Sequence, residues 1–140
     1  MCLYTTQKYK IATEPIKVYK LMFKPQSIPY EKKKWHYDYY FIIQEGGANI
    51  GQIVKCKIKI KEYPIVHYDN LGISFYKIGG EGVHAYISME YADRQALLHD
   101  VITEWEIPIG AKYWIGDCRG CLGEIAANEM KFLRVVKENK

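Results

Sequence analysis

A strict alternation of lysine and apolar residues between Ile53 and Tyr63 restricts the fold more than any other feature of the chain. Lysine occupies positions 55, 57, 59 and 61, and the residues between them are apolar: Val54, Cys56, Ile58 and Ile60. Successive side chains of a strand point to opposite faces, so the pattern predicts one antiparallel strand with a buried face and a wet face. The row of lysines would also keep a sheet edge from pairing with other chains.

The same period of two predicts most other elements as strands. Expected strands cover residues 16–23, 36–44, 73–78, 83–88, 101–107, 112–115 and 130–136. One helix is predicted over Met89–His99, with Ser88 as its N-cap and Glu90 in its first turn. The 140 residues show no repeat, low-complexity tract or linker. We therefore expect a single α+β domain over residues 1–140, mainly antiparallel β, with one clear helix at about 89–99.

The composition argues against a nucleic-acid groove. The net charge is only +4, and the chain contains 13 tyrosines that are scattered along its length. A groove for nucleic acid needs basic residues gathered with stacking aromatics, and only Lys32–Lys34 followed by Trp35 resembles that. We favour a solvated loop that enters an aromatic strand, because runs of charged residues are usually just exposed, so a nucleic-acid partner is not expected.

Cys118 and Cys121 have the C-x-x-C spacing that zinc or redox chemistry uses. They are expected in a glycine-rich loop, whereas a redox pair would begin a helix. A zinc site would need two further ligands, which only Cys2, Cys56 or a histidine could supply from a distance. We predict that the two cysteines bind no metal.

The first residues, Met-Cys-Leu-Tyr-Thr-Thr, do not have the charged start and apolar core of a secretory signal. No apolar run approaches the roughly 18 residues that a membrane-spanning helix needs. The expected location is therefore the cytoplasm, with no membrane partner.

Three segments together resemble the C-terminal half of the ADP-ribosyltransferase fold. They are His84-Ala85-Tyr86-Ile87-Ser88, Ile107-Pro108-Ile109-Gly110 and Gly123-Glu124-Ile125. The resemblance implies a split sheet with an NAD cleft. It also implies that Glu124, as a fixed anion, stabilises the positive charge that develops when nicotinamide departs.

The same resemblance assigns roles to further residues. Tyr86 and Ser88 would support the site, and Lys20, which follows Tyr19, would stand where the family has an Arg or His. The catalytic set implied is thus Glu124, Ser88, Tyr86 and Lys20, and Tyr19, Lys20 and His84 would bind the cofactor. Lysine does not reproduce the planar fork of arginine. Leu122 also stands where transferases that modify arginine or asparagine carry an acidic or amide residue.

A broader resemblance covers nearly the whole chain. The opening Cys-Leu-Tyr-Thr, the Ile-x-Val-Tyr-Lys strand, Gly-x-His-Ala-Tyr and Ile-Pro-x-Gly-Ala-Lys-Tyr are similar to small uncharacterised proteins of gut bacteria and their phages. This resemblance implies an origin in a mobile element and a location in the host cytosol if the chain is phage-encoded.

Two hypotheses follow. In the first, the chain is a non-enzymatic binding or structural module on an ADP-ribosyltransferase-like scaffold, with a protein partner and no cofactor. In the second, it is an NAD-dependent ADP-ribosyltransferase that modifies a host protein. The four histidines lack a serine or cysteine motif of the triad type, and no nucleotide-binding glycine pattern occurs, so no other catalytic class is supported.

Overall fold

The computed structural model describes residues 3–5, 8–27, 37–41, 46–56, 58–64, 74–80, 83–95, 101–116 and 123–138, with the strands at 58–64 and 74–80 described by their backbone. The strands are β1 (Leu3–Thr5), β2 (Lys10–Ile11), β3 (Ile16–Phe23), β4 (Tyr39–Phe41), β5 (Gly47–Ala48), β6 (Ile53–Lys55), β7 (Ile58–Pro64), β8 (Ser74–Gly80), β9 (Val83–Tyr86), β10 (Val101–Ile107), β11 (Lys112–Ile115), β12 (Glu124–Ala127) and β13 (Glu129–Glu138). A 3-10 turn, η1 (Pro25–Ser27), and one helix, α1 (Met89–Arg94), complete the described elements.

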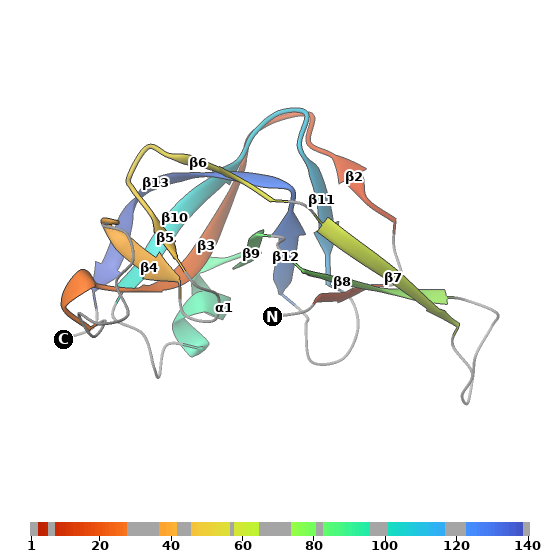
Figure 1. The fold of residues 1–140 in the computed structure, drawn as a ribbon, viewed down its shortest axis with the longest axis horizontal. Helices are drawn as coiled ribbons and strands as arrows, with labels where there is room; N and C mark the ends of the chain where they lie inside the picture. Colours follow the sequence, from red (N-terminus) through yellow and green to blue (C-terminus); the bar gives the residue numbers. More distant parts are fainter. Residues whose placement is uncertain are drawn as a thin grey trace.

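The strands form two antiparallel sheets (Figure 1). The larger sheet has the order β2-β11-β12-β9-β3-β10-β13-β6, with β4 and β5 added beside β3. The smaller sheet has the order β1-β8-β7 and contacts the larger one through β1, which lies against β11 and β12. The prediction of a mainly antiparallel β fold is therefore confirmed, and α1 is the one helix in the described part of the chain.

The core lies on one face of the larger sheet. Trp105 stacks on Phe132 with ring centroids 4.8 Å apart, and Val18 and Met22 are fully buried on the same face. The pairing of β13 with β10 shifts register twice, immediately before and immediately after the consecutive residues Thr103 and Glu104 of β10. Such irregularities bend a strand and increase its twist, which curves the sheet around the aromatic core.

Strand β3 changes its partner along its length. It pairs with β10 from Ile16 to Met22, but it pairs with β9 only where Tyr19 faces Tyr86. Beyond that point its free edge pairs with β4, through Met22 and Phe23. The sheet therefore forks beside β3, between β9 and β4.

Three predicted strands have the expected bounds, namely 16–23, 101–107 and 112–115. Strand β9 ends at Tyr86, two residues earlier than predicted, because Ser88 caps α1. β8 runs to Gly80 and β13 runs from Glu129 to Glu138, so both extend past their predicted ends. Of the strand predicted over 36–44, the described part contains β4 at Tyr39–Phe41.

The prediction of one continuous strand over 53–63 is wrong. β6 pairs with β13 in the larger sheet, whereas β7 pairs with β8 in the smaller one. The alternation itself holds over residues 53–56, where Ile53 and Lys55 are exposed while Val54 and Cys56 are half-buried against the core. Lys57 and the side chains of residues 58–61 lie outside the described part.

The predicted helix is confirmed at its start. Ser88 Oγ accepts a hydrogen bond from the Tyr91 backbone N–H at 3.2 Å, and Ala92 is buried. The described helix ends at Arg94 with Gln95 as its C-cap, and residues 96–99 of the predicted range lie outside the described residues.

Candidate functional site

Tyr19, Tyr86 and Glu124 form a row across three adjacent strands. Tyr19 on β3 faces Tyr86 on β9, and Tyr86 faces Glu124 on β12. Side chains that face each other across an antiparallel ladder lie on the same side of the sheet, with Cβ atoms about 5 Å apart. The three side chains therefore share one side of the sheet, and all three are half-buried. We call them the Tyr19–Tyr86–Glu124 row.

The row lies on the side opposite the core and is bordered by two elements. At one end β1 covers β12, where Leu3 packs with Trp114 and Ala126. At the other end α1 contacts β3 and β9, and its Asp93 accepts a hydrogen bond from Lys137 Nζ at 2.5 Å. Lys137 faces Ile102 on β10, which is on this same side of the sheet.

Tyr91 of α1 also approaches the row. A Cβ added to Gly123, the residue before Glu124, would lie 2.6 Å from carbons of the Tyr91 ring. Gly123 has φ of +84°, a left-handed conformation that favours glycine. The sequence pattern offered no signal for this contact, because Tyr91 reads simply as a helix residue.

The environment of the row shifts two proton equilibria. Burial raises the pKa of the Glu124 carboxyl, and the positive amino terminus of the chain lowers it to a smaller extent. Burial raises the pKa of the Tyr86 hydroxyl as well, and the neighbouring Glu124 charge raises it further. Both shifts have the direction expected of acidic groups that are partly removed from water beside one another.

Lys20 lies on the other side of the sheet. It faces Thr103 across the ladder, and Thr103 Oγ1 accepts a hydrogen bond from the buried Trp105 ring nitrogen at 2.8 Å. Its Nζ lies 4.9 Å from the centroid of the Phe41 ring and donates to the His84 backbone carbonyl at 2.6 Å. Lys20 thus fills the fork beside β3, and burial lowers the pKa of its ammonium to about 8.

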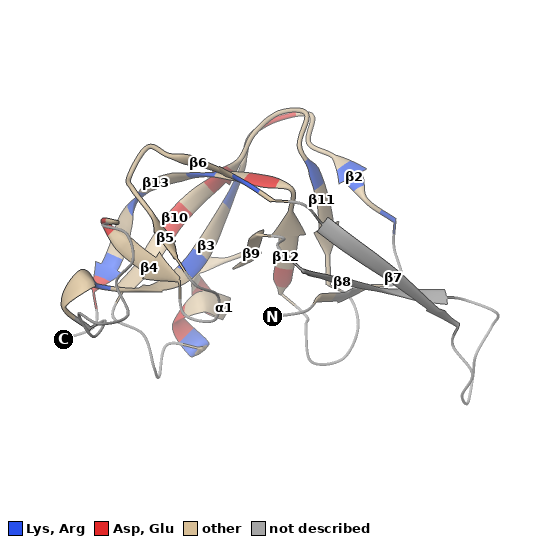
Figure 2. Ribbon diagram, in the orientation of Figure 1, with Lys and Arg blue, Asp and Glu red and all other residues tan. Residues whose placement is uncertain are grey.

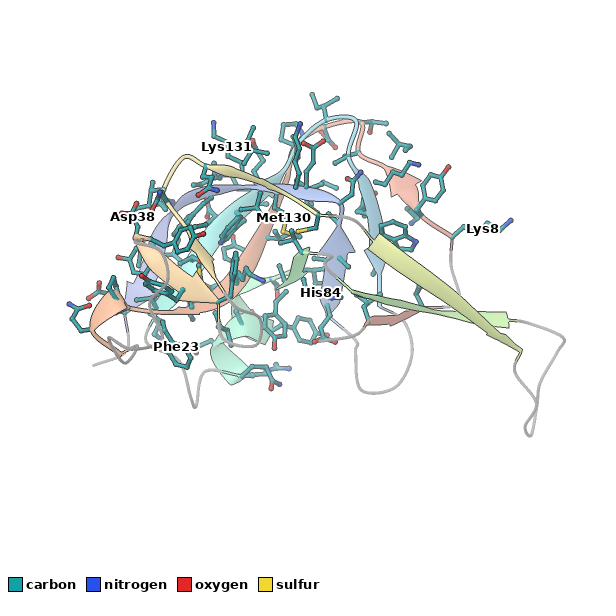
Figure 3. The ribbon with its side chains drawn as sticks, viewed as in Figure 1. Lys8, Phe23, Asp38, His84, Met130 and Lys131 are labelled. Atoms are coloured by element: carbon teal, nitrogen blue, oxygen red, sulfur yellow. The ribbon has the colours of Figure 1, made fainter. Side chains whose placement is uncertain are left out.

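His84 lies on the same side as the row, because it faces Ala126 while Tyr86 faces Glu124. Its side chain lies in the interior of the molecule (Figure 3), and the residue is only 7% exposed. Neither ring nitrogen has a hydrogen-bond partner among the residues that the structure describes. Burial, followed by the charge of Lys20, lowers the pKa of His84 to about 4, so the imidazole is neutral at pH 7.

The predicted site residues are therefore only partly brought together. Tyr19, Tyr86, Glu124 and His84 share one side of the sheet, whereas Lys20 points into the core on the other side. Ser88 lies one residue beyond Ile87, whose N–H bonds the Gly123 carbonyl at 2.8 Å, but its hydroxyl caps α1. Sequence reasoning did not find Phe41 and Thr103 beside Lys20, because both contacts depend on distant strands.

Within the described ranges, no group of three or more His, Cys, Asp or Glu residues is placed to hold a metal ion. Cys118 and Cys121 lie outside these ranges, so their predicted lack of metal stays a prediction. Among the described residues, no helix is long and apolar enough to cross a membrane. No protein-family model matches the chain, and no match to it was found among curated proteins or solved structures.

Proposed function

We propose that this chain is a non-enzymatic binding module that holds a protein partner against the Tyr19–Tyr86–Glu124 row. The observation that carries the proposal is the register that places two half-buried tyrosines and a half-buried glutamate side by side. Tyrosine is enriched at protein interfaces, since its ring supplies contact area and its hydroxyl supplies a hydrogen bond.

The mixture of acidic and basic residues near the row favours binding through specific local contacts over binding through long-range electrostatic attraction. Figure 2 shows acidic and basic segments side by side on β3, β10 and β13. Glu104 on β10, for example, is buried between Lys17 at 3.7 Å and Arg134 at 3.4 Å. A mixed surface of this kind does not attract a uniformly charged polymer such as a nucleic acid.

The scaffold that we propose is ADP-ribosyltransferase-like. The fork of the larger sheet beside β3 supports it, because the resemblance implies a split sheet with the candidate residues near the split. The origin in a phage or other mobile element, and hence action in the host cytosol, is part of the same proposal and depends on the sequence resemblance.

Photocrosslinking tests the binding proposal. A photoreactive phenylalanine analogue would be placed at position 86, and the control would carry it at position 109, where Ile109 is 65% exposed on a distant turn. In a lysate of the cell that makes the protein, we expect a protein adduct from position 86 and none from position 109. The purified partner should then bind Tyr86→Ala at least about tenfold more weakly than the wild type.

An absent adduct at position 86, or a partner whose affinity does not change in Tyr86→Ala, would refute the proposal. A circular dichroism melt of each variant separates a lost contact from a lost fold.

The second candidate is the NAD-dependent transferase. The pairing of Tyr86 with Glu124 favours it, because a half-buried glutamate beside a tyrosine strand is what the resemblance implies for the cleft. The resemblance also requires an Arg or His at the position of Lys20, with its side chain in the cleft, but Lys20 lies on the core side. We therefore rank the transferase below the binding module.

NAD separates the two candidates. A transferase should bind NAD and be stabilised by mass action, so its melting temperature should rise with NAD concentration. It should also release nicotinamide in the wild type but not in Glu124→Gln, which removes a charge that acts in the transition state. For a binding module we expect neither effect. Nicotinamide release that disappears in Glu124→Gln would reverse the ranking.

A further inference from the structure

Strand β2 forms one outer edge of the larger sheet. On its inner side, the Ala12 N–H donates to the Ala111 carbonyl at 2.9 Å, and the Ala12 carbonyl accepts from the Gly110 N–H at 2.8 Å. Backbone groups of successive strand residues point to opposite edges, so the N–H and the carbonyl of Ile11 point away from β11. In the part of the chain that the structure describes, no strand pairs with this outer edge. The turn that carries Ile109 lies on the inner side.

Two exposed apolar side chains lie along this edge. Tyr9 is 46% exposed and Ile11 is 47% exposed. The Tyr9 ring meets the ring of the buried Trp114 edge-on, with centroids 6.0 Å apart, and the Lys112 ammonium lies 4.7 Å from the Tyr9 centroid. Ile11 faces Lys112 across the ladder, so Ile11 and Tyr9 lie on the same side of the sheet. The two contacts hold the Tyr9 ring before a partner arrives, which lowers the entropic cost of binding.

Basic side chains flank the same edge. Lys10 faces Tyr113 across the ladder, so it lies on the opposite side of the sheet from Ile11. Lys8 points away from the sheet (Figure 3), and Figure 2 shows basic segments on β2 and on the neighbouring β11. Glu14, beyond the end of β2, is the one acidic residue in this segment of the sequence. The edge therefore attracts an acidic strand, whereas a second copy of β2 would bring lysine against lysine.

We infer that the outer edge of β2 binds an extended, acidic segment of a partner protein by strand addition. The segment pairs its backbone with the N–H and the carbonyl of Ile11. Its side chains alternate between the two sides of the sheet, so apolar ones lie against Tyr9 and Ile11 while acidic ones lie near Lys10. This surface is separate from the Tyr19–Tyr86–Glu124 row, because β11 lies between β2 and β12. The inference goes beyond the proposed function and does not rest on it.

A synthetic peptide tests the inference in an NMR titration of the full chain. The probe is a capped hexapeptide in which valine and glutamate alternate, and the control peptide has lysine in place of each glutamate. We expect the acidic probe to shift the amide signals of Tyr9 and Ile11 and to bind at least about tenfold more tightly than the control. The Ile11 N–H should exchange with solvent more slowly in the complex, whereas exchange of the Lys10 N–H, which points toward β11, should not change.

Two methylated forms of the probe separate strand addition from charge attraction alone. An added strand directs every second backbone N–H toward its neighbour. Methylation of one alternating set of the probe's backbone nitrogens should therefore abolish binding to the wild-type protein, and methylation of the other set should be tolerated. Equal binding of the two methylated probes would overturn the inference.

A variant and its control locate the site. Lys10→Glu should weaken the binding of the acidic probe at least about tenfold, because attraction becomes repulsion. Lys55→Glu is the matched control: Lys55 is also exposed on an outer strand, but that strand is β6, at the opposite end of the larger sheet. Its affinity for the probe should equal that of the wild type. A circular dichroism melt of both variants confirms that they are folded.

Sedimentation of the chain alone tests a second copy as the occupant of the edge. Ile11→Pro removes an N–H that points outward, so it blocks strand addition while leaving the pairing of β2 with β11. A wild-type dimer that Ile11→Pro abolishes would assign the edge to a second copy and overturn the inference, as would equal binding of the acidic and the basic peptide. The crosslinking test at position 86 is unaffected by either result, because the added strand contacts neither the row nor the turn at position 109.

Discussion

The Lys20 ammonium donates a hydrogen bond to the backbone carbonyl of His84 at 2.6 Å, across the fork where β3 leaves β9. In a continuous ladder a backbone N–H would bind this carbonyl. The lysine side chain supplies the donor because β3 has already turned to β4 at this point. Lys20 therefore has a structural function that is independent of any ligand.

Replacement of Lys20 by methionine should change how stability depends on pH. Burial lowers the folded-state pKa of Lys20 to about 8 from its ordinary value of 10.5, so the unfolded chain binds more protons between these values. Stability should thus rise with pH in this window, by up to about 2 kcal/mol from pH 7 to pH 9.5. Urea unfolding at both pH values should show this rise in the wild type relative to Lys20→Met.

The difference between the wild type and Lys20→Met is the informative quantity, because every other ionisable group is the same in both. At pH 7 the Lys20→Met variant loses the hydrogen bond to the His84 carbonyl, which costs about 1–3 kcal/mol of unfolding free energy. It also loses a buried positive charge, which is a gain in stability. We expect the loss and the gain nearly to offset each other. An identical pH dependence in the two proteins would contradict the assignment of Lys20 to a buried fork.

His84 should make the protein sensitive to acid. Burial lowers its folded pKa to about 4 from the ordinary histidine value of 6.5, so the unfolded chain binds the additional proton between these values. Stability should therefore fall as pH decreases through this window, by about 3 kcal/mol between pH 7 and pH 4. His84→Leu should lose this component, as thermal unfolding in a series of buffers would show.

At pH 7 the same variant should be at least as stable as the wild type. The histidine nitrogens have no partner among the described residues, so leucine removes two unsatisfied polar atoms and keeps an apolar side chain. A loss of more than about 2 kcal/mol at pH 7 would show that the ring makes a stabilising polar contact.

Gly123→Ala should be more damaging than the same change at another left-handed glycine. Both Gly123 and Gly51 have positive φ, but a new Cβ meets the Tyr91 ring only at Gly123 and meets nothing within 4 Å at Gly51. Gly51→Ala should cost about 1 kcal/mol of unfolding free energy from backbone strain. Gly123→Ala should cost about 3 kcal/mol, because the clash adds to the strain.

A double variant measures the clash directly. Tyr91→Ala removes the ring, so Gly123→Ala should cost only about 1 kcal/mol in that background. Denaturant unfolding of the four proteins of the cycle gives the coupling. Simple additivity would mean that the ring does not pack on Gly123.

Ser88→Ala should lower the unfolding free energy by about 1 kcal/mol, because the Tyr91 N–H loses its capping acceptor. Ser88→Asp keeps an acceptor and should retain most of the stability. Equal stability losses in the two variants would show that the cap contributes little.

Local pattern predicted several elements well. The bounds of β3, β10 and β11 follow from alternation and from flanking prolines, and the start of α1 follows from the chemistry of the Ser88 cap. The period of two also separates Tyr19 from Lys20, because consecutive strand residues point to opposite sides. Assigning both residues to one cofactor site conflicts with that rule, and the structure places them on opposite sides.

Other features could not be predicted, because they depend on partners distant in sequence. The alternation over 53–63 gives no sign that β6 joins β13 while β7 joins β8. Nor does the residue pattern show that Tyr91 packs on Gly123, since the two positions are brought together by the pairing of β9 with β12.

The sequence by itself determined the bounds of several strands, the start of the helix and the side that each residue of those strands takes, because side-chain alternation and capping act within a few residues. The tertiary structure alone decided which strands became neighbours. The strand pairing places Tyr19, Tyr86 and Glu124 side by side in one row. It also leaves the backbone carbonyl of His84 to accept a hydrogen bond from the Lys20 ammonium. Pairing between distant strands is selected by the packing of the whole core, so no local pattern encodes it.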